Sequence, residues 1–125
     1  MKRSVKVMSM SYKNDYGKVV IDKEVIKKIV SYSSKQCYGL VGMASKNKST
    51  GIVELLSFFD SGKGINIEIK DNLIYIELFV IIQYGTKVSV VAENMIDRIK
   101  YDVESQTGLK VKKISVNVQG VRVSN

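Results

Sequence analysis

The sequence predicts an α+β protein with two layers, in which a mixed β-sheet carries two main helices on one face. Two segments, near 22–38 and 86–107, have apolar residues in a single stripe at helical spacing. Residues 65–82 have the pattern of two strands joined by a short turn, with isoleucines at alternate positions. The predicted order is strand, helix, strand, short helix, strand, strand, helix, strand. Because each helix has one apolar stripe, both are expected on the same side of the sheet, and the other sheet face is expected to be mostly polar.

Length and composition restrict the class of protein. The chain has 125 residues, which suits one domain, and 45% hydrophobic and 26% charged residues are ordinary for a globular protein. Cys37 is the only cysteine, so no internal disulfide can form and a reducing compartment, the cytoplasm, is expected. The longest apolar run, 73–82, contains Glu77 and is too short to span a bilayer.

The N-terminal part of the chain is predicted to be a flexible basic arm at 1–16, followed by one domain at 17–123. The arm lacks the continuous apolar stretch of a secretory signal, and it carries a net charge of +3 out of a total of +8. A positive balance favours anionic partners such as nucleic acid or lipid headgroups. Scattered lysines that serve only solubility are the alternative.

The first predicted elements of the domain are a strand at 17–21 and a helix that begins after Asp22, an N-cap residue. Gly39 is expected to end this helix in the left-handed conformation. A strand at 40–45 follows, and 52–59 is either a short helix or a strand. The apolar stripe of the helix is formed by Val25, Ile26, Ile29, Val30, Ser33 and Cys37.

The hairpin at 65–82 is the most informative segment. Asp71 and Asn72 both tolerate positive φ and can form a two-residue turn, which sets the register by counting outward. A slip by one residue would bury the polar set, so the register is strongly specified. The expected pairs on the core face are Ile69–Ile74, Ile67–Ile76 and Ile65–Leu78, and those on the opposite face are Glu68–Tyr75 and Asn66–Glu77.

Three large side chains fall on the face opposite the core, namely Tyr75, Phe79 and Ile81. Phe79 and Ile81 also extend past the end of the partner strand. An apolar surface of this kind is either covered by another part of the chain, such as 52–59 or the arm, or available to a partner. We predict that Tyr75, Phe79 and Ile81 form the centre of an interaction surface.

The second helix, of about 20 residues, is expected to begin at Thr86 and to end at Gly108. The last strand, 111–123, changes the parity of its apolar residues at Gly120, which a β-bulge there would explain. The buried stripe of the helix is formed by Val88, Val91, Ala92, Met95, Ile99 and Val103.

The sequence contains no recognisable catalytic or cofactor-binding pattern. Cys37 has no histidine to act as its base, because the chain has none, and Asp22 is better explained as a helix cap. A transition-metal site is improbable without histidine. Residues 61–64 lack the spacing of a phosphate-binding loop. We therefore expect no enzymatic activity, no catalytic residues, no cofactor and no metal.

A nucleic-acid-binding module is the alternative function. Such sheets stack bases on aromatic side chains among basic residues. Tyr75 and Phe79 lie on the outer face with Lys70 and Lys113, which fits this alternative, whereas the neighbouring carboxylates Glu68 and Glu77 weigh against it.

Six short motifs, in this order and spacing, resemble the alkaline shock protein family of Gram-positive bacteria, also called the Gls-type envelope stress response proteins. The resemblance covers about residues 16 to 123. The motifs are Gly17-Lys18-Val19 with Ile21, Gly39-Leu40-Val41-Gly42-Met43, Gly64-Ile65, Tyr84-Gly85, Thr107-Gly108-Leu109, and Val116-Asn117-Val118-Gln119-Gly120-Val121.

The resemblance implies a small cytoplasmic protein without known catalytic activity, linked to cell-envelope stress or homeostasis. It implies a non-enzymatic interaction or scaffold role, with homo-oligomers and peripheral membrane association through a membrane-anchored partner. A shorter subgroup similar to this chain is often encoded beside a fatty-acid-kinase-like protein, which makes that protein a further candidate partner. The long charged terminal extensions of better-known members are missing here, which puts membrane recruitment and filament formation in doubt.

Overall fold

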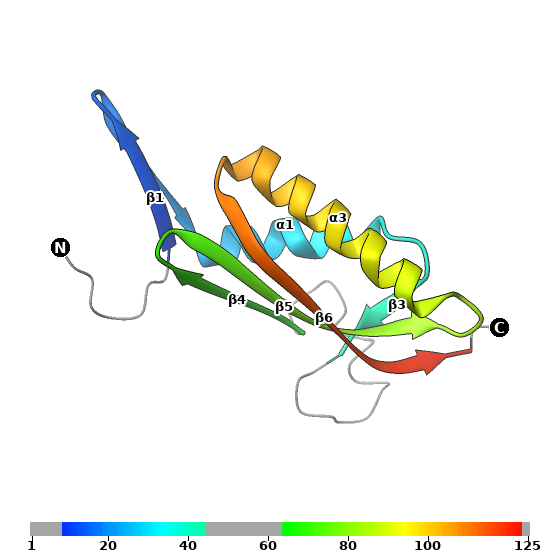
Figure 1. Cartoon of the computed structure of the whole chain (residues 1–125). Coiled ribbons are helices and arrows are strands. Elements are labelled where there is room, and N and C mark those ends of the chain that lie inside the picture. The colour runs from blue at the N-terminus through cyan, green and yellow to red at the C-terminus, as the bar shows by residue number, and fades with distance from the viewer. Residues whose placement is uncertain (1–8, 45–63, 124–125) are drawn as a thin grey trace.

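The computed structural model describes residues 9–44 and 64–123, of which 9–14 are described by their backbone alone. Figure 1 shows α1 and α3 side by side on one face of a sheet, running in opposite directions. The predicted two-layer α+β class is confirmed, and the expected short helix at 52–59 lies outside the described residues. The elements are β1 (Ser9–Asn14), β2 (Gly17–Asp22), α1 (Lys23–Lys35), β3 (Leu40–Met43), β4 (Ile65–Lys70), β5 (Leu73–Gln83), α3 (Val88–Thr107) and β6 (Lys110–Arg122).

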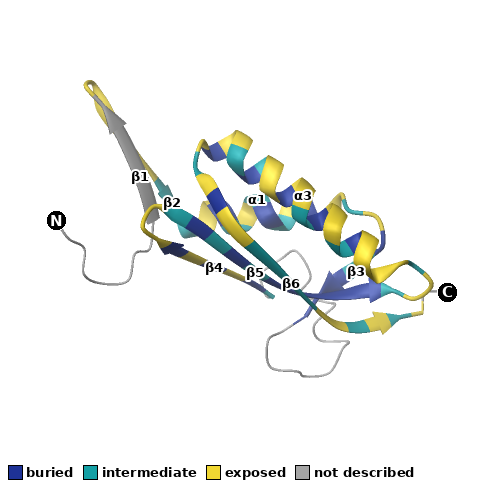
Figure 2. Ribbon diagram, in the orientation of Figure 1, coloured by how far each residue is buried: buried dark blue, intermediate teal, exposed yellow. Residues whose placement is uncertain are grey.

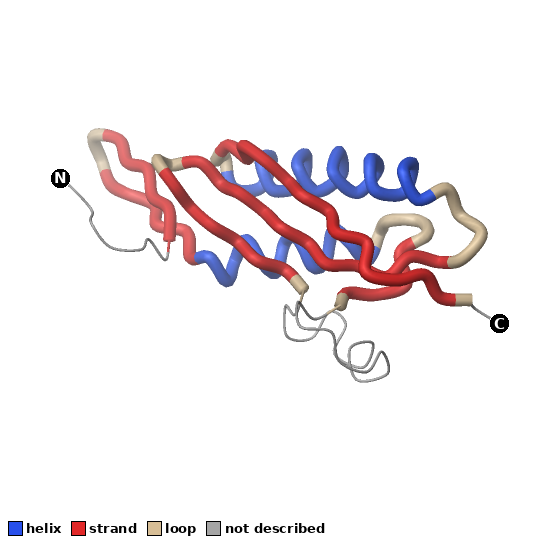
Figure 3. Tube along the Cα trace, turned by 60° about the horizontal axis from the view of Figure 1, so that its bottom comes forward, coloured by secondary structure: helices blue, strands red, loops and turns tan. Residues whose placement is uncertain are grey.

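The central strand of the main sheet is β5. β4 pairs antiparallel with its first part and β3 pairs antiparallel with its last part, so these two short strands follow each other along one side (Figure 3). β6 runs parallel to β5 along the other side. The sheet is therefore mixed, as predicted.

The β4–β5 hairpin has the predicted register. Ile65 pairs with Leu78 and the pairing continues in step to Lys70 and Leu73. Asp71 and Asn72 form the turn with φ of 51° and 64°, the mirror-image geometry that suits the right-handed twist of a hairpin. The turn and the isoleucine alternation thus agree on one register.

The core lies between the sheet and the two helices (Figure 2). The predicted burial is wrong for two residues of the stripes. Val25 and Val88 lie in the first turns of their helices and are 47% and 39% exposed. The stripe residues that are buried as predicted are Ile26, Val30 and Ser33 of α1 and Val91, Met95, Ile99 and Val103 of α3.

Helix α1 ends earlier than predicted, at Lys35. The N–H groups of Gln36 and Cys37 donate to the carbonyls of Ser33 and Ser34, both at 3.0 Å, which tightens the chain into a turn of three-residue spacing. Gly39 follows this turn with a φ of 88°. Gly108 ends α3 in the left-handed conformation, as predicted.

The predicted arm at 1–16 is wrong in part, because Ser9–Asn14 forms strand β1 and pairs antiparallel with β2. The two strands make a separate sheet that projects past the end of the main sheet (Figure 1). The predicted strand at 17–21 therefore lies in this hairpin. Residues 1–8 lie outside the described part of the chain.

Strand β6 contains two irregularities. Ile74 and Tyr75 are consecutive on β5, but the residues of β6 that pair with them are separated by one extra residue, Lys112. In the same way, the residues of β6 that pair with Val80 and Ile81 are separated by the extra residue Gln119. The second shift confirms the predicted bulge and places the extra residue one position before Gly120. Each bulge restores the match between the apolar residues of β6 and the core face.

Candidate functional site

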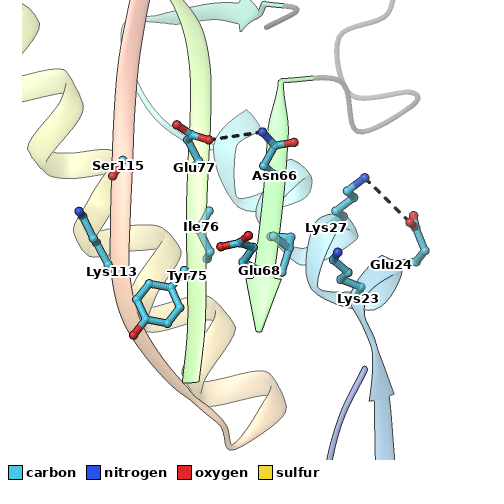
Figure 4. Close-up of a pocket in the computed structure, with 11 residues that line it drawn as sticks. Lys23, Glu24, Lys27, Asn66, Glu68, Tyr75, Ile76, Glu77, Lys113 and Ser115 are labelled. Carbon is cyan, nitrogen blue, oxygen red and sulfur yellow. Dashed lines mark hydrogen bonds and ion pairs between the residues drawn. The ribbon is translucent and has the colours of Figure 1, made fainter. Parts of the chain in front are cut away.

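The sheet face opposite the helices carries a polar groove of about 660 Å³ (Figure 4). Strands β4, β5 and β6 form its floor, and the first turns of α1 border it beyond the edge of β4. The polar residues that line it are Lys23, Glu24 and Lys27 of α1, Asn66 and Glu68 of β4, Tyr75 and Glu77 of β5, and Lys113 and Ser115 of β6.

The strand registers arrange six of these side chains in two rows across the sheet. Every second residue of a strand points to this face, and residues that pair across strands are neighbours on it. One row is Glu68, Tyr75 and Lys113, and the other is Asn66, Glu77 and Ser115. The groove floor therefore follows directly from the hairpin register and the parallel pairing of β6.

The contacts within the groove are weak and exposed. The Asn66 Nδ2 donates to Glu77 Oε1 at 3.4 Å, and the Lys70 Nζ lies 5.4 Å from the centroid of the Tyr75 ring. At the groove wall, Lys27 and Glu24 form an ion pair at 3.9 Å. Both signs of charge are present, and the described residues contain no group of three ligands that could hold a metal ion. Such an arrangement suits recognition of a surface with mixed charge.

The structure brings one of the three predicted contact residues into this groove. Tyr75 is half-buried and lies in the groove floor. Phe79 and Ile81 are only 8% and 7% exposed, and they form a small apolar cluster with Ala44, against which Val41 packs. The sequence left open whether these side chains are covered within the chain or available to a partner. Phe79 and Ile81 are covered, so they are not available to a partner.

Sequence reasoning missed the part of the groove that comes from α1. In the sequence, Lys23, Glu24 and Lys27 fall outside the apolar stripe of the helix and have no local feature that distinguishes them. They reach the groove only because α1 packs beside β4. No signal in the sequence could have identified them.

Among the described residues, the two groups with perturbed pKa values lie away from the groove. Burial raises the pKa of the Cys37 thiol, with Arg98 opposing and Asp102 adding to this effect. A thiol of this kind is a poor nucleophile at neutral pH. The Val111 N–H donates to Glu104 Oε2 at 2.8 Å, and this hydrogen bond, with Lys100 at 3.1 Å, lowers the pKa of Glu104.

Comparison with known proteins identifies the family. Residues 11–123 match the model of the alkaline shock protein 23 family, described as having a cell envelope-related function. The uncharacterized protein YloU of Bacillus subtilis is 39% identical over 119 residues, which cover 94% of this chain and 99% of YloU. The uncharacterized protein Spy1614 of Streptococcus pyogenes is 31% identical over 117 residues, covering 93% of this chain and 97% of that protein.

Among solved structures, the copper form of the MamM CTD aligns with a TM-score of 0.47 and 8% identity, over 82% of this chain and 87% of that chain. A likeness at this level carries no argument about function. Within the described residues, no helix is both long and apolar enough to cross a membrane. The extent of the family match and the relatives of nearly equal length show that the chain belongs to the alkaline shock protein 23 family, whose function is related to the cell envelope.

Proposed function

We propose that this protein is a non-enzymatic interaction or scaffold protein of the cytoplasm, which supports the cell envelope through protein–protein contacts. The observation that carries the proposal is the open sheet face, where two rows of mixed polar and charged side chains surround the half-buried ring of Tyr75. An aromatic ring within a polar, charged rim is a common composition for a protein–protein contact.

The charges on this face favour a protein over a nucleic acid as the partner. Each row contains one carboxylate, Glu68 in the first and Glu77 in the second, whereas Lys113 is the only cation in the rows. Phosphate groups would be repelled by the two carboxylates, and sheets that bind nucleic acid surround their aromatic residues with basic ones. Phe79, the second aromatic side chain expected for base stacking, is buried.

The absence of an enzymatic role is part of the same proposal. The groove contains carboxylates and lysines, but the chain has no histidine, and the raised pKa of Cys37 leaves its thiol protonated. The partners proposed from the family resemblance are a second copy of the chain, a membrane-anchored protein or a fatty-acid-kinase-like protein. The envelope link then arises through the partner.

The proposal is tested by photo-crosslinking in the native cell. Benzoylphenylalanine replaces Tyr75 in one strain and Tyr101 in the control strain, because Tyr101 is a 71% exposed residue of α3 on the helical layer. We expect protein adducts from position 75 in clear excess over position 101. Equal adducts from both positions, or adducts that nuclease removes, would contradict the proposed contact face.

A further inference from the structure

Several chain segments meet at one end of the domain, which we call the Tyr84 end. The Gln83 N–H donates to the Gly39 carbonyl at 2.8 Å and so joins the end of β5 to the residue before β3. The Tyr84 N–H donates to the Arg122 carbonyl at 2.9 Å and so joins the same place to the end of β6. Figure 1 shows this end on the right, where α1 also ends and α3 begins. The segments that form the Tyr84 end are 32–40, 82–90 and 118–123.

Large apolar side chains at the Tyr84 end are exposed to solvent. The rings of Tyr32, Tyr38 and Tyr84 are 65%, 79% and 67% exposed. Figure 2 shows the turn between β5 and α3 and the last part of β6 as mostly exposed. The exposed valines of this end are Val88, Val90, Val118, Val121 and Val123. Exposed aromatic and aliphatic side chains gathered in this way indicate a surface that contacts a partner.

The charged side chains of the Tyr84 end are all cations. They belong to Lys35, Lys87 and Arg122, and the three segments contain no aspartate or glutamate. The Lys35 Nζ lies 5.4 Å from the centroid of the Tyr32 ring, so one cation is placed directly beside an exposed aromatic side chain. Along α3, the first carboxylate is that of Glu93, in the second turn. The side chains of this end therefore attract an anionic surface, whereas the groove has mixed charge.

This combination of side chains suits the surface of a lipid bilayer. Tyrosine is enriched at the headgroup level, because its ring is apolar and its hydroxyl group is hydrated. Aliphatic side chains enter the boundary of the acyl chains, and lysine and arginine bind the phosphates of anionic lipids. A single-stranded nucleic acid would satisfy the cations and the rings, but it offers no aliphatic surface to the valines. The composition therefore favours anionic lipid over nucleic acid.

We propose that the Tyr84 end binds directly to the surface of a bilayer that contains anionic lipids. The rings of Tyr38 and Tyr84 lie at the level of the headgroups, and Lys87 and Arg122 contact the lipid phosphates. This contact goes beyond the proposed function, because none of the residues that line the groove belongs to the Tyr84 end. The groove stays available to a protein partner while the Tyr84 end is on the bilayer.

Flotation of the full chain with lipid vesicles tests the contact. The probes are unilamellar vesicles of phosphatidylcholine and phosphatidylglycerol in equal parts, and vesicles of phosphatidylcholine alone. At low salt we expect the chain to bind the mixed vesicles and not the neutral ones, because anionic lipid provides the attraction. Raising the salt to about 0.5 M NaCl should release the chain, since salt screens charges at a surface.

Removal of two cations tests which part of the chain binds. Lys87→Gln together with Arg122→Gln should weaken binding to the mixed vesicles about 25-fold, because each cation near an anionic surface contributes about fivefold. The matched control is Lys28→Gln together with Lys112→Gln, which removes the same charge from two exposed lysines outside the Tyr84 end. The control pair should change binding much less. Thermal melts that match the wild type show that both pairs are folded.

Tryptophan fluorescence tests whether the exposed rings enter the bilayer surface. The chain has no tryptophan, so one introduced residue gives the whole signal. The emission of Tyr84→Trp should shift to the blue when mixed vesicles are added, because its ring moves from water to the headgroup region. Tyr101→Trp is the matched control, since Tyr101 is 71% exposed on α3 outside the Tyr84 end, and its emission should not shift.

Three results would overturn the lipid contact. The first is the absence of wild-type binding to mixed vesicles. The second is an equal effect of both substitution pairs, or an equal shift at positions 84 and 101, which would show attraction by the net charge of +8 alone. The third is binding of an oligouridine that depends on Lys87 and Arg122 without binding of vesicles, which would assign this end to nucleic acid. In each case, protein adducts from position 75 in cells would still support the groove, so the two proposals fail separately.

Discussion

Replacing Gly64 by alanine tests the packing at the start of β4. Gly64 has a φ of 77°, and a Cβ atom there would lie 2.5 Å from the Ala44 carbonyl oxygen and 2.9 Å from that of Phe79. Both carbonyls belong to the backbone. The Ala44 N–H donates to Phe79 O at 2.8 Å, and the Phe79 N–H donates to Gly64 O at 2.9 Å. The new methyl group must therefore displace hydrogen-bonded backbone.

The expected cost has two parts. Positive φ in a residue with a Cβ costs about 1–2 kcal/mol. Displacing the Phe79 carbonyl weakens its hydrogen bond from the Ala44 N–H, and the shift of Gly64 away from these carbonyls weakens the bond from the Phe79 N–H to Gly64 O, at about 1 kcal/mol each. Gly64→Ala should therefore lower the free energy of unfolding by about 3 kcal/mol, which corresponds to roughly 10 °C in Tm for a chain of this size.

Gly108→Ala is the matched control. Gly108 has a φ of 78°, but a Cβ atom there would meet no atom within 4 Å. Its cost should be the conformational part alone, about 1 kcal/mol. Urea unfolding followed by circular dichroism, with an unchanged m-value, measures both variants. Equal destabilisation of the two would refute the argument that the Gly64 backbone is tightly enclosed.

Three further predictions concern the turn, the end of α3 and the contact between the helices. Asn72→Val should cost about 1–2 kcal/mol in urea unfolding because φ is 64° there, whereas Asn72→Gly should be nearly neutral. At neutral pH the wild-type protein should be more stable than Glu104→Gln, because the hydrogen bond from the Val111 N–H lowers the pKa of Glu104. Protonation of Glu104 should remove this difference in stability as the pH falls through the lowered pKa. A difference that does not depend on pH would contradict the assignment. A double-mutant cycle of Ser33→Ala and Asp102→Ala should give a coupling energy of about 1 kcal/mol, because Ser33 Oγ donates to Asp102 Oδ2 at 2.7 Å between α1 and α3. Additive effects of the two substitutions on stability would contradict this coupling.

The β4–β5 hairpin shows how far the sequence could predict the candidate site. Two turn residues that accept positive φ and an alternation of period two specify the same register, so Glu68–Tyr75 and Asn66–Glu77 were correctly placed side by side. Both signals are local, and they agree. Four of the six side chains in the groove rows follow from this hairpin.

The cover over Phe79 and Ile81 could not be derived in the same way. It depends in part on β3, in which Gly42 pairs with Ile81 and beside which Ala44 joins their cluster. β3 is four residues long, and its register with β5 carries a bulge. Nothing in so short a pattern determines which strand it pairs with.

By itself the sequence determined the helices, the hairpin register and the family, because periodic apolar residues and turn chemistry act over a few residues. Only the tertiary structure decided that β1 and β2 form a separate hairpin and that Lys23 and Lys27 border the groove. It also decided that the edge of β4 has no strand beside it in the described part of the chain. These features depend on which elements pack together, and packing is set by contacts between residues far apart in the chain.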